Sequence, residues 1–309
     1  MLSNIAGIIG GKFGLYGHLP ALLYKYGTVA LSIKNQEFVR TRLDLKKYYD
    51  RIVWLKDDQE VLAQSSLLVL AVPPLAQEEI IFNNIELLTS KKLILEKPLS
   101  DNPKSAQVLL KNLIKYKINF RVNYTFFVTE WFYEICSLLY SNQHYEIVIK
   151  WEFLAHHFKE PSHIWKKYHS KGGGCLRFFS IHLIALLAHL KFKKIKSSQL
   201  FYVDTDIPYK WFAQLNDNKN RAIICVDSKA TNNFFHVTVI QNKKTIYEKH
   251  IDSPFEENKN KMFSDIRSVY ILEILSQLDK DNLPFMKQYL EINQLWSHIE
   301  KFSDHKLNA

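Results

Sequence analysis

Short apolar runs alternate with stretches of helical periodicity in the first part of the chain. The apolar runs cover residues 5–9, 28–33, 66–72, 92–95 and 119–122. Helical stretches lie among them at 19–26, 78–88 and 106–116. Nearly continuous apolar strands separated by helices are typical of a parallel sheet that is covered on both faces. The pattern therefore predicts a doubly wound α/β domain over residues 1–122, of the Rossmann type that binds dinucleotides.

The pattern changes after residue 122. A helical stretch at 128–139 leads into residues 145–154, which alternate between apolar and polar positions as a half-buried strand does. The later elements are an apolar helix at 181–190, strand-like runs at 199–203, 211–215, 221–226, 234–241 and 244–250, and helices at 264–278 and 285–302. Strands in succession without intervening helices predict a second α/β domain, residues 123–309, built on an open, mainly antiparallel sheet. We expect this sheet to mediate a homodimer.

Composition narrows the classes of protein that fit. No apolar run reaches the roughly 18 residues that a membrane span needs. The N-terminus lacks the basic segment of a signal peptide, and the three cysteines are scattered without a CxxC pair, so we expect a reduced, cytoplasmic setting. The net charge of +10 is spread over dispersed lysine pairs, which favours a solvated surface over a nucleic-acid site. Neither a metal site nor a nucleophilic triad is predicted.

Glycine is rare and concentrated. The chain has nine glycines, where average usage would supply roughly 22. Five of them fall in the segment GIIGGKFGLYGHLP at positions 7–20, between the first apolar run and the first helix, where a dinucleotide-binding turn belongs. The segment departs from a strict GxGxxG: either Lys12 stands where the second glycine is expected, or the loop is one residue short and Gly11 takes that role. We predict a cofactor site formed by Gly10, Gly11, Lys12, Phe13 and Gly14; the alternative is a glycine-rich turn kept for packing.

The predicted strand ends carry the other candidate groups. The segment after the second strand, Ser32-Ile33-Lys34-Asn35, has no acid to bind the ribose hydroxyls of NAD. Lys34 could instead pair with the 2′-phosphate of NADP, which predicts a preference for NADP over NAD; a solvated lysine is the alternative. The triplet Glu96-Lys97-Pro98 follows another strand, and a lysine partly desolvated at this edge can act as a general acid or base. A structural Lys–Glu pair is the other interpretation.

Together these segments resemble the glucose–fructose oxidoreductase/inositol dehydrogenase (Gfo/Idh/MocA) family over most of the chain. The matching features are the 7–20 turn with its His-Leu-Pro ending, Ala71-Val72-Pro73-Pro74, Glu96-Lys97-Pro98, Val122-Asn123-Tyr124, and Gly172-Gly173-Gly174 followed by His182. The resemblance implies a nicotinamide-binding domain joined to an α/β domain, acting on a sugar or sugar derivative. It implies that Lys97 contacts the reacting hydroxyl and the nicotinamide, that His182 assists proton transfer, and that Val72, Pro73, Pro74 and Glu96 join the cofactor site.

The chain also departs from that family. The resemblance implies an aspartate four residues before the histidine and a glycine two residues before it, where this chain has Phe178 and Ser180. A phenyl ring cannot accept a hydrogen bond from a sugar hydroxyl, whereas Arg177 next to it could bind a carboxylate or phosphate. Trp165 and Lys166 could stack on a ring and neutralise a phosphate, which suggests a nucleotide sugar. The residues predicted to contact substrate are Tyr124, Trp165, Lys166, Arg177 and His182.

Two hypotheses for the function follow. The first is an NADP- or NAD-dependent oxidoreductase that transfers hydride to or from a sugar or nucleotide sugar, with Lys97 as acid/base and His182 assisting. The second is a catalytically silent family member that binds a nucleotide or sugar as a regulatory or scaffold protein, which Phe178 and the altered glycine turn favour. Both use a small-molecule ligand rather than a nucleic acid or a membrane.

Overall fold

The computed structural model describes residues 5–141, 144–159, 164–255 and 262–307. The chain forms two compact units. The first unit contains residues 1–99, 108–125 and 258–286, and the second contains residues 100–107, 126–257 and 287–309. This division differs from a single boundary after residue 122, because the chain passes between the units more than once. In particular, the helix near residue 270 belongs to the first unit.

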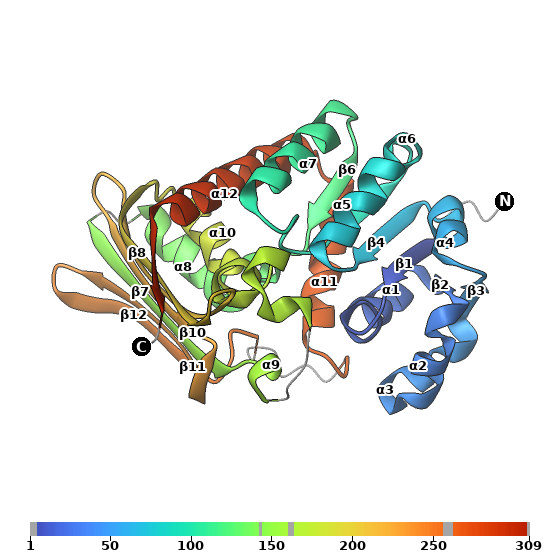
Figure 1. Ribbon diagram of the computed structural model, residues 1–309, viewed down its shortest axis with the longest axis horizontal. Coiled ribbons are helices and arrows are strands. Elements are labelled where there is room, and N and C mark those ends of the chain that lie inside the picture. The colour runs from blue at the N-terminus through green and yellow to red at the C-terminus, as the bar shows by residue number, and fades with distance from the viewer. Residues whose placement is uncertain (1–4, 142–143, 160–163, 256–261, 308–309) are drawn as a thin grey trace. The chain divides into compact units, whose positions relative to one another are not determined.

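The first unit is built on a six-stranded sheet in which every neighbouring pair is parallel, in the order β3-β2-β1-β4-β5-β6 (Figure 1). Its strands are β1 (Ala6–Gly10), β2 (Val29–Ser32), β3 (Ile52–Leu55), β4 (Leu67–Ala71), β5 (Lys92–Leu95) and β6 (Asn119–Val122). The chain order reverses between β1 and β4. In a sheet of this kind, ligands bind beyond the carboxyl ends of the strands at such a switch point.

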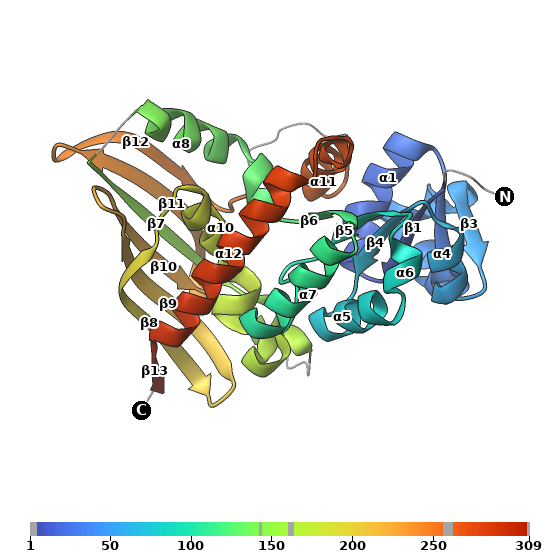
Figure 2. The same cartoon turned by 90° about the horizontal axis from the view of Figure 1, so that it is seen from above.

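Helices cover both faces of this sheet. The helices of the first unit are α1 (Leu19–Tyr26), α2 (Gln36–Thr41), α3 (Leu43–Lys46), α4 (Asp58–Gln64), α5 (Pro74–Asn83), α6 (Ile85–Leu88) and α11 (Arg267–Ser276), while α7 (Pro103–Lys115) contributes to both units. Helices α1 and α11 lie on one side of the sheet, and α5 and α6 lie on the other (Figure 2). This arrangement explains why β1, β2 and β4 are apolar along almost their whole length: both of their faces are buried.

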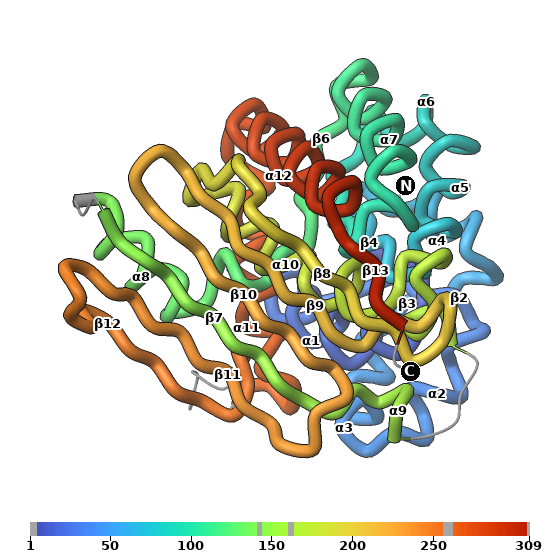
Figure 3. Tube along the Cα trace, turned by 60° about the vertical axis from the view of Figure 1, so that its left-hand side comes forward, coloured from blue at the N-terminus to red at the C-terminus, as the bar shows by residue number. Residues whose placement is uncertain are grey.

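The second unit contains a seven-stranded sheet in the order β12-β11-β7-β10-β9-β8-β13 (Figure 3). Its strands are β7 (Tyr145–Leu154), β8 (Lys194–Asp204), β9 (Ile207–Asn216), β10 (Arg221–Asp227), β11 (Lys229–Gln241), β12 (Lys244–Ile251) and β13 (Ser303–Leu307). The β7–β10 and β8–β13 pairs are parallel, and the other four pairs are antiparallel. The predicted fold class, a Rossmann sheet plus an α/β domain with an open and mainly antiparallel sheet, is confirmed.

One face of the second sheet packs against helices. Helices α8 (Glu130–Ser141), α10 (Ile181–His189) and α12 (Leu283–Phe302) lie over the same face (Figure 2). Burial alternates along β7, where Ile147, Ile149 and Trp151 point into this core and the residues between them do not. No single helix in the described ranges is long and apolar enough to cross a membrane, although the bent pair 169–179 and 181–189 has a suitable length and composition.

Candidate functional site

The glycine turn lies at the switch point of the first sheet. Strand β1 ends at Gly10, which is the register partner of Ala71 at the end of β4. Gly10 has a φ of +137°, and a Cβ on it would lie 2.2 Å from the carbonyl oxygen of Ala71. A Cβ on Gly14 would lie 2.7 Å from the Cβ of Ala71. Both glycines are therefore required by the close approach of β4.

Gly11 is different, because it faces open space. The nearest atom to a Cβ on Gly11 would be Oδ1 of Asn35, at 3.7 Å. Lys12 follows with a φ of +45°, and the π-helix η1 (Gly14–His18) then continues directly into α1. The N–H of Gly14 donates to the carbonyl of Gly11 at 2.9 Å, but no hydrogen bond within the described ranges uses the N–H of Lys12 or Phe13.

Free N–H groups at the start of a helix, beside a glycine that leaves room, fit the pyrophosphate of a dinucleotide. The geometry favours the shortened-loop interpretation of the turn, in which Gly11 takes the place of the second glycine. Phe13 does not face this open side: its ring packs over Gly17, where a Cβ would lie 2.4 Å from the ring, and its edge meets His18 with 5.3 Å between ring centroids. Phe13 therefore packs inside the turn, against Gly17 and His18, and not on the side where the cofactor is proposed to bind.

The segment after β2 places Lys34 and Asn35 differently. Lys34 is more than half exposed and forms an ion pair with Asp58 at the start of α4. Asn35 is buried, and its Nδ2 donates to the carbonyl of Gly10 at 3.0 Å. Asn35 thus supports the glycine turn, a role that was not predicted from the sequence. Its signal was a short polar side chain three residues after the second strand, in the segment where a ribose-binding acid would lie.

The carboxyl ends of β4 and β5 are joined by a buried glutamine. Val72 and Pro73 lead from β4 into α5, which begins at Pro74. Gln77 on α5 is fully buried; its Nε2 donates to the carbonyls of Glu96 (3.1 Å) and Leu99 (3.0 Å), and its Oε1 accepts from the N–H of Glu96 (2.8 Å). The Lys97–Pro98 peptide within this turn is cis. Gln77 therefore fixes the backbone on either side of Lys97, a role for which the sequence carries no local signal.

The carboxylate of Glu96 lies in a buried polar cluster. Its Oε1 accepts a hydrogen bond from Nε2 of His18 at 2.7 Å and another from Nδ2 of Asn123 at 2.8 Å. Burial by itself raises the pKa of Glu96, but the hydrogen bond and charge of His18, the charge of Lys97 and the bond from Asn123 together lower it below its ordinary value. Glu96 is thus held ionised next to Lys97.

In the second unit, the last two glycines of the Gly172–Gly174 triplet are required by close crossings of the chain. A Cβ on Gly173 would lie 2.4 Å from the carbonyl oxygen of Trp165, and one on Gly174 (φ +76°) would lie 2.4 Å from Cγ of Pro208. The crossing at Gly173 brings the Trp165 loop next to the start of η7 (Cys175–Ser180). The Trp165 ring meets the edge of Phe178 at 5.3 Å between centroids, and Nζ of Lys166 lies 4.9 Å from the centroid of Phe178. Two predicted substrate residues therefore gather around Phe178.

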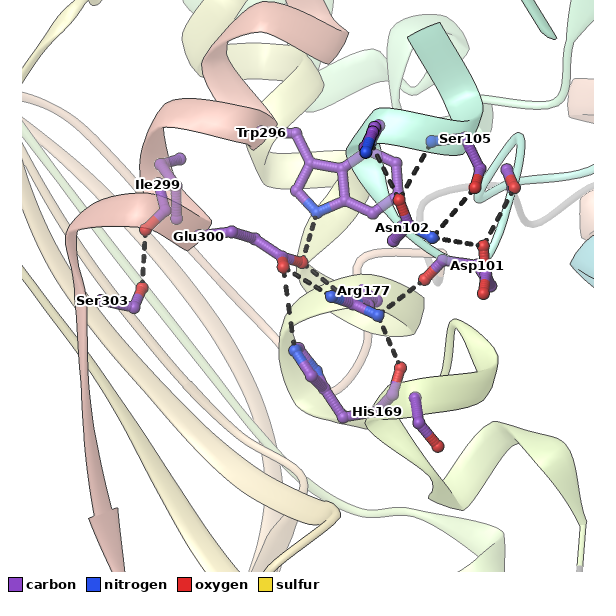
Figure 4. Close-up of polar contacts among 12 residues, drawn as sticks. Asp101, Asn102, Ser105, His169, Arg177, Trp296, Ile299, Glu300 and Ser303 are labelled. Atoms are coloured by element: carbon purple, nitrogen blue, oxygen red, sulfur yellow. Dashed lines mark hydrogen bonds and ion pairs between the residues drawn. The ribbon is translucent and has the colours of Figure 1, made fainter. Parts of the chain in front are cut away.

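Arg177 has another set of partners (Figure 4). Its Nε and Nη2 each donate to a carboxylate oxygen of Glu300 at 2.6 Å, and its Nη1 donates to the carbonyls of Asp101 (2.8 Å) and His169 (2.9 Å). The indole N–H of Trp296 also donates to Glu300, at 2.9 Å. Each guanidinium nitrogen is thus engaged, and this arginine ties η7 to α12 and to the segment that follows Lys97. The predicted contact of Arg177 with substrate stays a prediction.

His182 and Tyr124 are both buried. His182 lies in the first turn of α10, and its ring stacks on Phe126 with 4.5 Å between centroids and 19° between planes. Tyr124 follows β6 in the first unit, and its predicted contact with substrate stays a prediction. In the described part of the chain, no group of three His, Cys, Asp or Glu side chains is arranged to hold a metal ion.

Solved structures share this fold over nearly the whole chain. KijD10, a 3-ketoreductase from Actinomadura kijaniata in complex with NADP and TDP-benzene, matches with a TM-score of 0.73 at 13% identity, covering 99% of both chains. The WlbA (WbpB) dehydrogenase from Thermus thermophilus, in complex with NAD and UDP-GlcNAcA, matches with a TM-score of 0.69 at 13% identity, covering 99% of this chain and 97% of the other.

A dehydrogenase (MviM) from Clostridium difficile matches with a TM-score of 0.71 at 14% identity, covering 96% of this chain and 99% of the other. No family model matches the chain, and no curated protein matches it in sequence. At these identities the likeness establishes the fold of the chain, which consists of a Rossmann unit and a second α/β unit.

Proposed function

We propose that this protein is an NAD(P)-dependent oxidoreductase that acts on a sugar or nucleotide sugar. The observation that carries the proposal is the glycine turn at the switch point: Gly11 leaves open space beside the unengaged N–H groups of Lys12 and Phe13. These groups would hold the cofactor's pyrophosphate, with Asn35 bracing the turn. When bound, the nicotinamide accepts or supplies a hydride at its ring.

Lys97 is the proposed acid/base. The backbone beside it is fixed by Gln77, and its neighbour Glu96 is held by two buried donors, so the main chain that carries Lys97 is held in place. As hydride leaves or reaches a sugar carbon, Nζ of Lys97 would take the proton from the hydroxyl or return it to the carbonyl oxygen. His182, in the second unit, would assist this proton transfer.

The neighbouring structures support a sugar or nucleotide-sugar substrate. KijD10 was solved with NADP and TDP-benzene, and WlbA with NAD and UDP-GlcNAcA. In this chain, Trp165 and Lys166 next to Phe178 supply an aromatic face and a cation of the kind that a nucleotide sugar needs. We also propose that the open sheet of the second unit forms a homodimer.

The decisive experiment is a calorimetric titration of the purified protein with NADPH and then with NADH, after its near-ultraviolet absorbance has been checked for carried-over cofactor. Binding of either, lost in a Gly11→Val variant that remains folded, supports the proposal and justifies a screen of sugar nucleotides for turnover. A well-folded protein that binds neither cofactor contradicts it.

A second candidate function is a non-catalytic binding protein that kept this fold. Phe178 favours it, because the phenyl ring, packed against Trp165 and Lys166, offers no hydrogen-bond acceptor for a sugar hydroxyl. The two candidates separate on turnover: an oxidoreductase oxidises NADPH or reduces NADP with a sugar nucleotide, whereas a binding protein forms the complexes without changing the 340 nm absorbance.

A further inference from the structure

Three segments of the first unit meet at one oxygen atom. His18 ends η1, Glu96 follows β5, and Asn123 follows β6. The imidazole of His18 is fully buried, Asn123 is 2% exposed, and both donate to Oε1 of Glu96. Because a carboxylate only accepts hydrogen bonds, Nε2 of His18 must carry the proton, and the amide of Asn123 must turn its nitrogen toward Glu96.

The other oxygen of Glu96 is in a different situation. No hydrogen bond within the described ranges reaches Oε2, and 14% of the Glu96 side chain remains exposed. The two buried donors therefore anchor one oxygen on the inside and leave the other as an acceptor. A carboxylate fixed in this way has a defined direction, which an unanchored glutamate side chain lacks.

The orientation of His18 is itself fixed from several sides. The ring edge of Phe13 packs against the imidazole, and Gly17 provides the room for Phe13. Oγ of Ser268 on α11 donates to the carbonyl of Gly17 at 2.7 Å, which holds η1 from the outside. The helical segment η1 begins at the glycine turn and ends at His18, the donor that fixes Glu96. One element therefore connects the glycine turn with the Glu96–Lys97 turn, the two parts of the proposed cofactor site.

We propose that His18 is a positioning residue: by anchoring Oε1 of Glu96, it directs Oε2 toward a hydrogen-bond donor of the reacting ligands. That donor is either the carboxamide N–H₂ of the nicotinamide or a hydroxyl of the substrate. Asn123 is the second anchor of the same oxygen. This inference rests on the proposed function, since it requires a nicotinamide cofactor to bind at the glycine turn.

The test uses two ligands and three variants of the full chain. His18→Phe removes the donor but keeps a ring, and His18→Gln restores an N–H near the position of Nε2. Glu96→Gln keeps an oxygen for the two buried donors and changes only the free position, from acceptor to donor. The affinities of NADPH and of 2′-phospho-ADP-ribose, which lacks nicotinamide, are measured by calorimetry at a temperature where circular dichroism shows each variant folded. His236→Gln, on the second sheet, is the matched control.

We expect His18→Phe and Glu96→Gln to weaken NADPH roughly tenfold to hundredfold, the range for one hydrogen bond to a charged group, and to leave 2′-phospho-ADP-ribose unchanged. His18→Gln should recover most of the loss. If NADPH binding is unchanged but the KM of an active sugar nucleotide rises, the donor belongs to the substrate. Unchanged NADPH affinity and KM in both His18→Phe and Glu96→Gln overturn the inference, whereas failure of the wild-type protein to bind NADPH or NADH overturns the proposed function instead.

Discussion

Gly10 and Ala71 end neighbouring parallel strands so closely that a Cβ on Gly10 would lie 2.2 Å from the carbonyl oxygen of Ala71. The next residue, Gly11, has no such neighbour, since its Cβ would meet only Oδ1 of Asn35 at 3.7 Å. Two adjacent glycines therefore serve different purposes. Gly10 is needed for the fold, whereas Gly11 leaves a space that the folded protein itself does not fill.

Substitution should separate these two purposes. Gly10→Ala forces a side chain into the carbonyl of Ala71 at a φ of +137°, so we expect the free energy of unfolding to fall by several kcal/mol. Gly11→Val should change it by less than about 1 kcal/mol, yet weaken NADPH at least tenfold by filling the space for the pyrophosphate. Urea denaturation and calorimetry measure the two effects. Full NADPH affinity in Gly11→Val would place the cofactor elsewhere.

Lys97→Ala tests the proposed acid/base. Removing a proton-transfer group lowers turnover by roughly a hundredfold to ten-thousandfold, while the backbone around residue 97 stays fixed by Gln77. We therefore expect kcat to collapse and the melting temperature to change little. Lys97→Arg is the matched control, since it keeps the positive charge but cannot exchange a proton near neutral pH. Near wild-type turnover in either variant would contradict the mechanism.

The proposed preference for NADP rests on Lys34, which forms an ion pair that the sequence did not reveal. Lys34 pairs with Asp58, so part of its charge is already compensated. We expect Lys34→Ala to weaken NADPH severalfold without affecting NADH, and Asp58→Asn to strengthen NADPH by releasing the lysine. The measurement is the ratio of the two dissociation constants at low ionic strength. Tighter binding of NADH than NADPH by the wild-type protein would overturn the predicted preference for NADP.

The sequence predicts this fold well because its main signal is periodicity. The buried strands β1 and β4 are apolar throughout, β5 is apolar after Lys92, and β7 alternates between buried and more exposed positions. Strand β3 was missed because it lies at the edge of the sheet, where only Ile52 is buried and the pattern is lost. Strand β13 was missed for a similar reason: its residues are mostly exposed, and only its pairing with β8 makes it a strand.

The candidate site was predicted in part. Glycine spacing and the Glu-Lys-Pro triplet pointed to the turn and to Lys97, because those signals are local in sequence. Gln77, His18 and Asn123 were not identified as supports, because their partners lie 19, 78 and 27 residues away. For Arg177, a cation beside a candidate site, the sequence suggested a ligand contact but did not reveal the partner Glu300, which lies 123 positions later.

The Arg177–Glu300 pair should be a major contributor to the stability of the second unit. Both side chains are largely buried, so Arg177→Leu leaves a buried carboxylate uncompensated, and we expect a loss of about 3–5 kcal/mol. The double variant Arg177→Leu/Glu300→Leu should recover part of it, although Trp296 then loses its acceptor. The exposed pair of Lys191 and Glu291 is the control, where Lys191→Ala should cost less than about 1 kcal/mol. Similar losses for Arg177→Leu and Lys191→Ala, measured in urea, would contradict this assignment.

Stability should fall as the pH drops from about 6.5 toward 4. Burial, reinforced by the nearby charges of Lys167, His156 and Lys166, lowers the pKa of His157 from 6.5 to about 4. Between these pH values, His157 is protonated in the unfolded chain but not in the folded chain. Its contribution to the free energy of unfolding is therefore fully present above pH 6.5 and is lost as the pH falls through 4.

The shift corresponds to about 3 kcal/mol for this one buried side chain. His169, whose pKa burial also lowers to about 4, acts in the same direction. His157→Phe should therefore reduce the pH dependence of the unfolding free energy between pH 6.5 and 4.5 by about one proton without abolishing it. Urea denaturation of both proteins at several pH values measures the slopes. Equal slopes would mean that His157 is protonated as easily in the folded protein as in the unfolded chain.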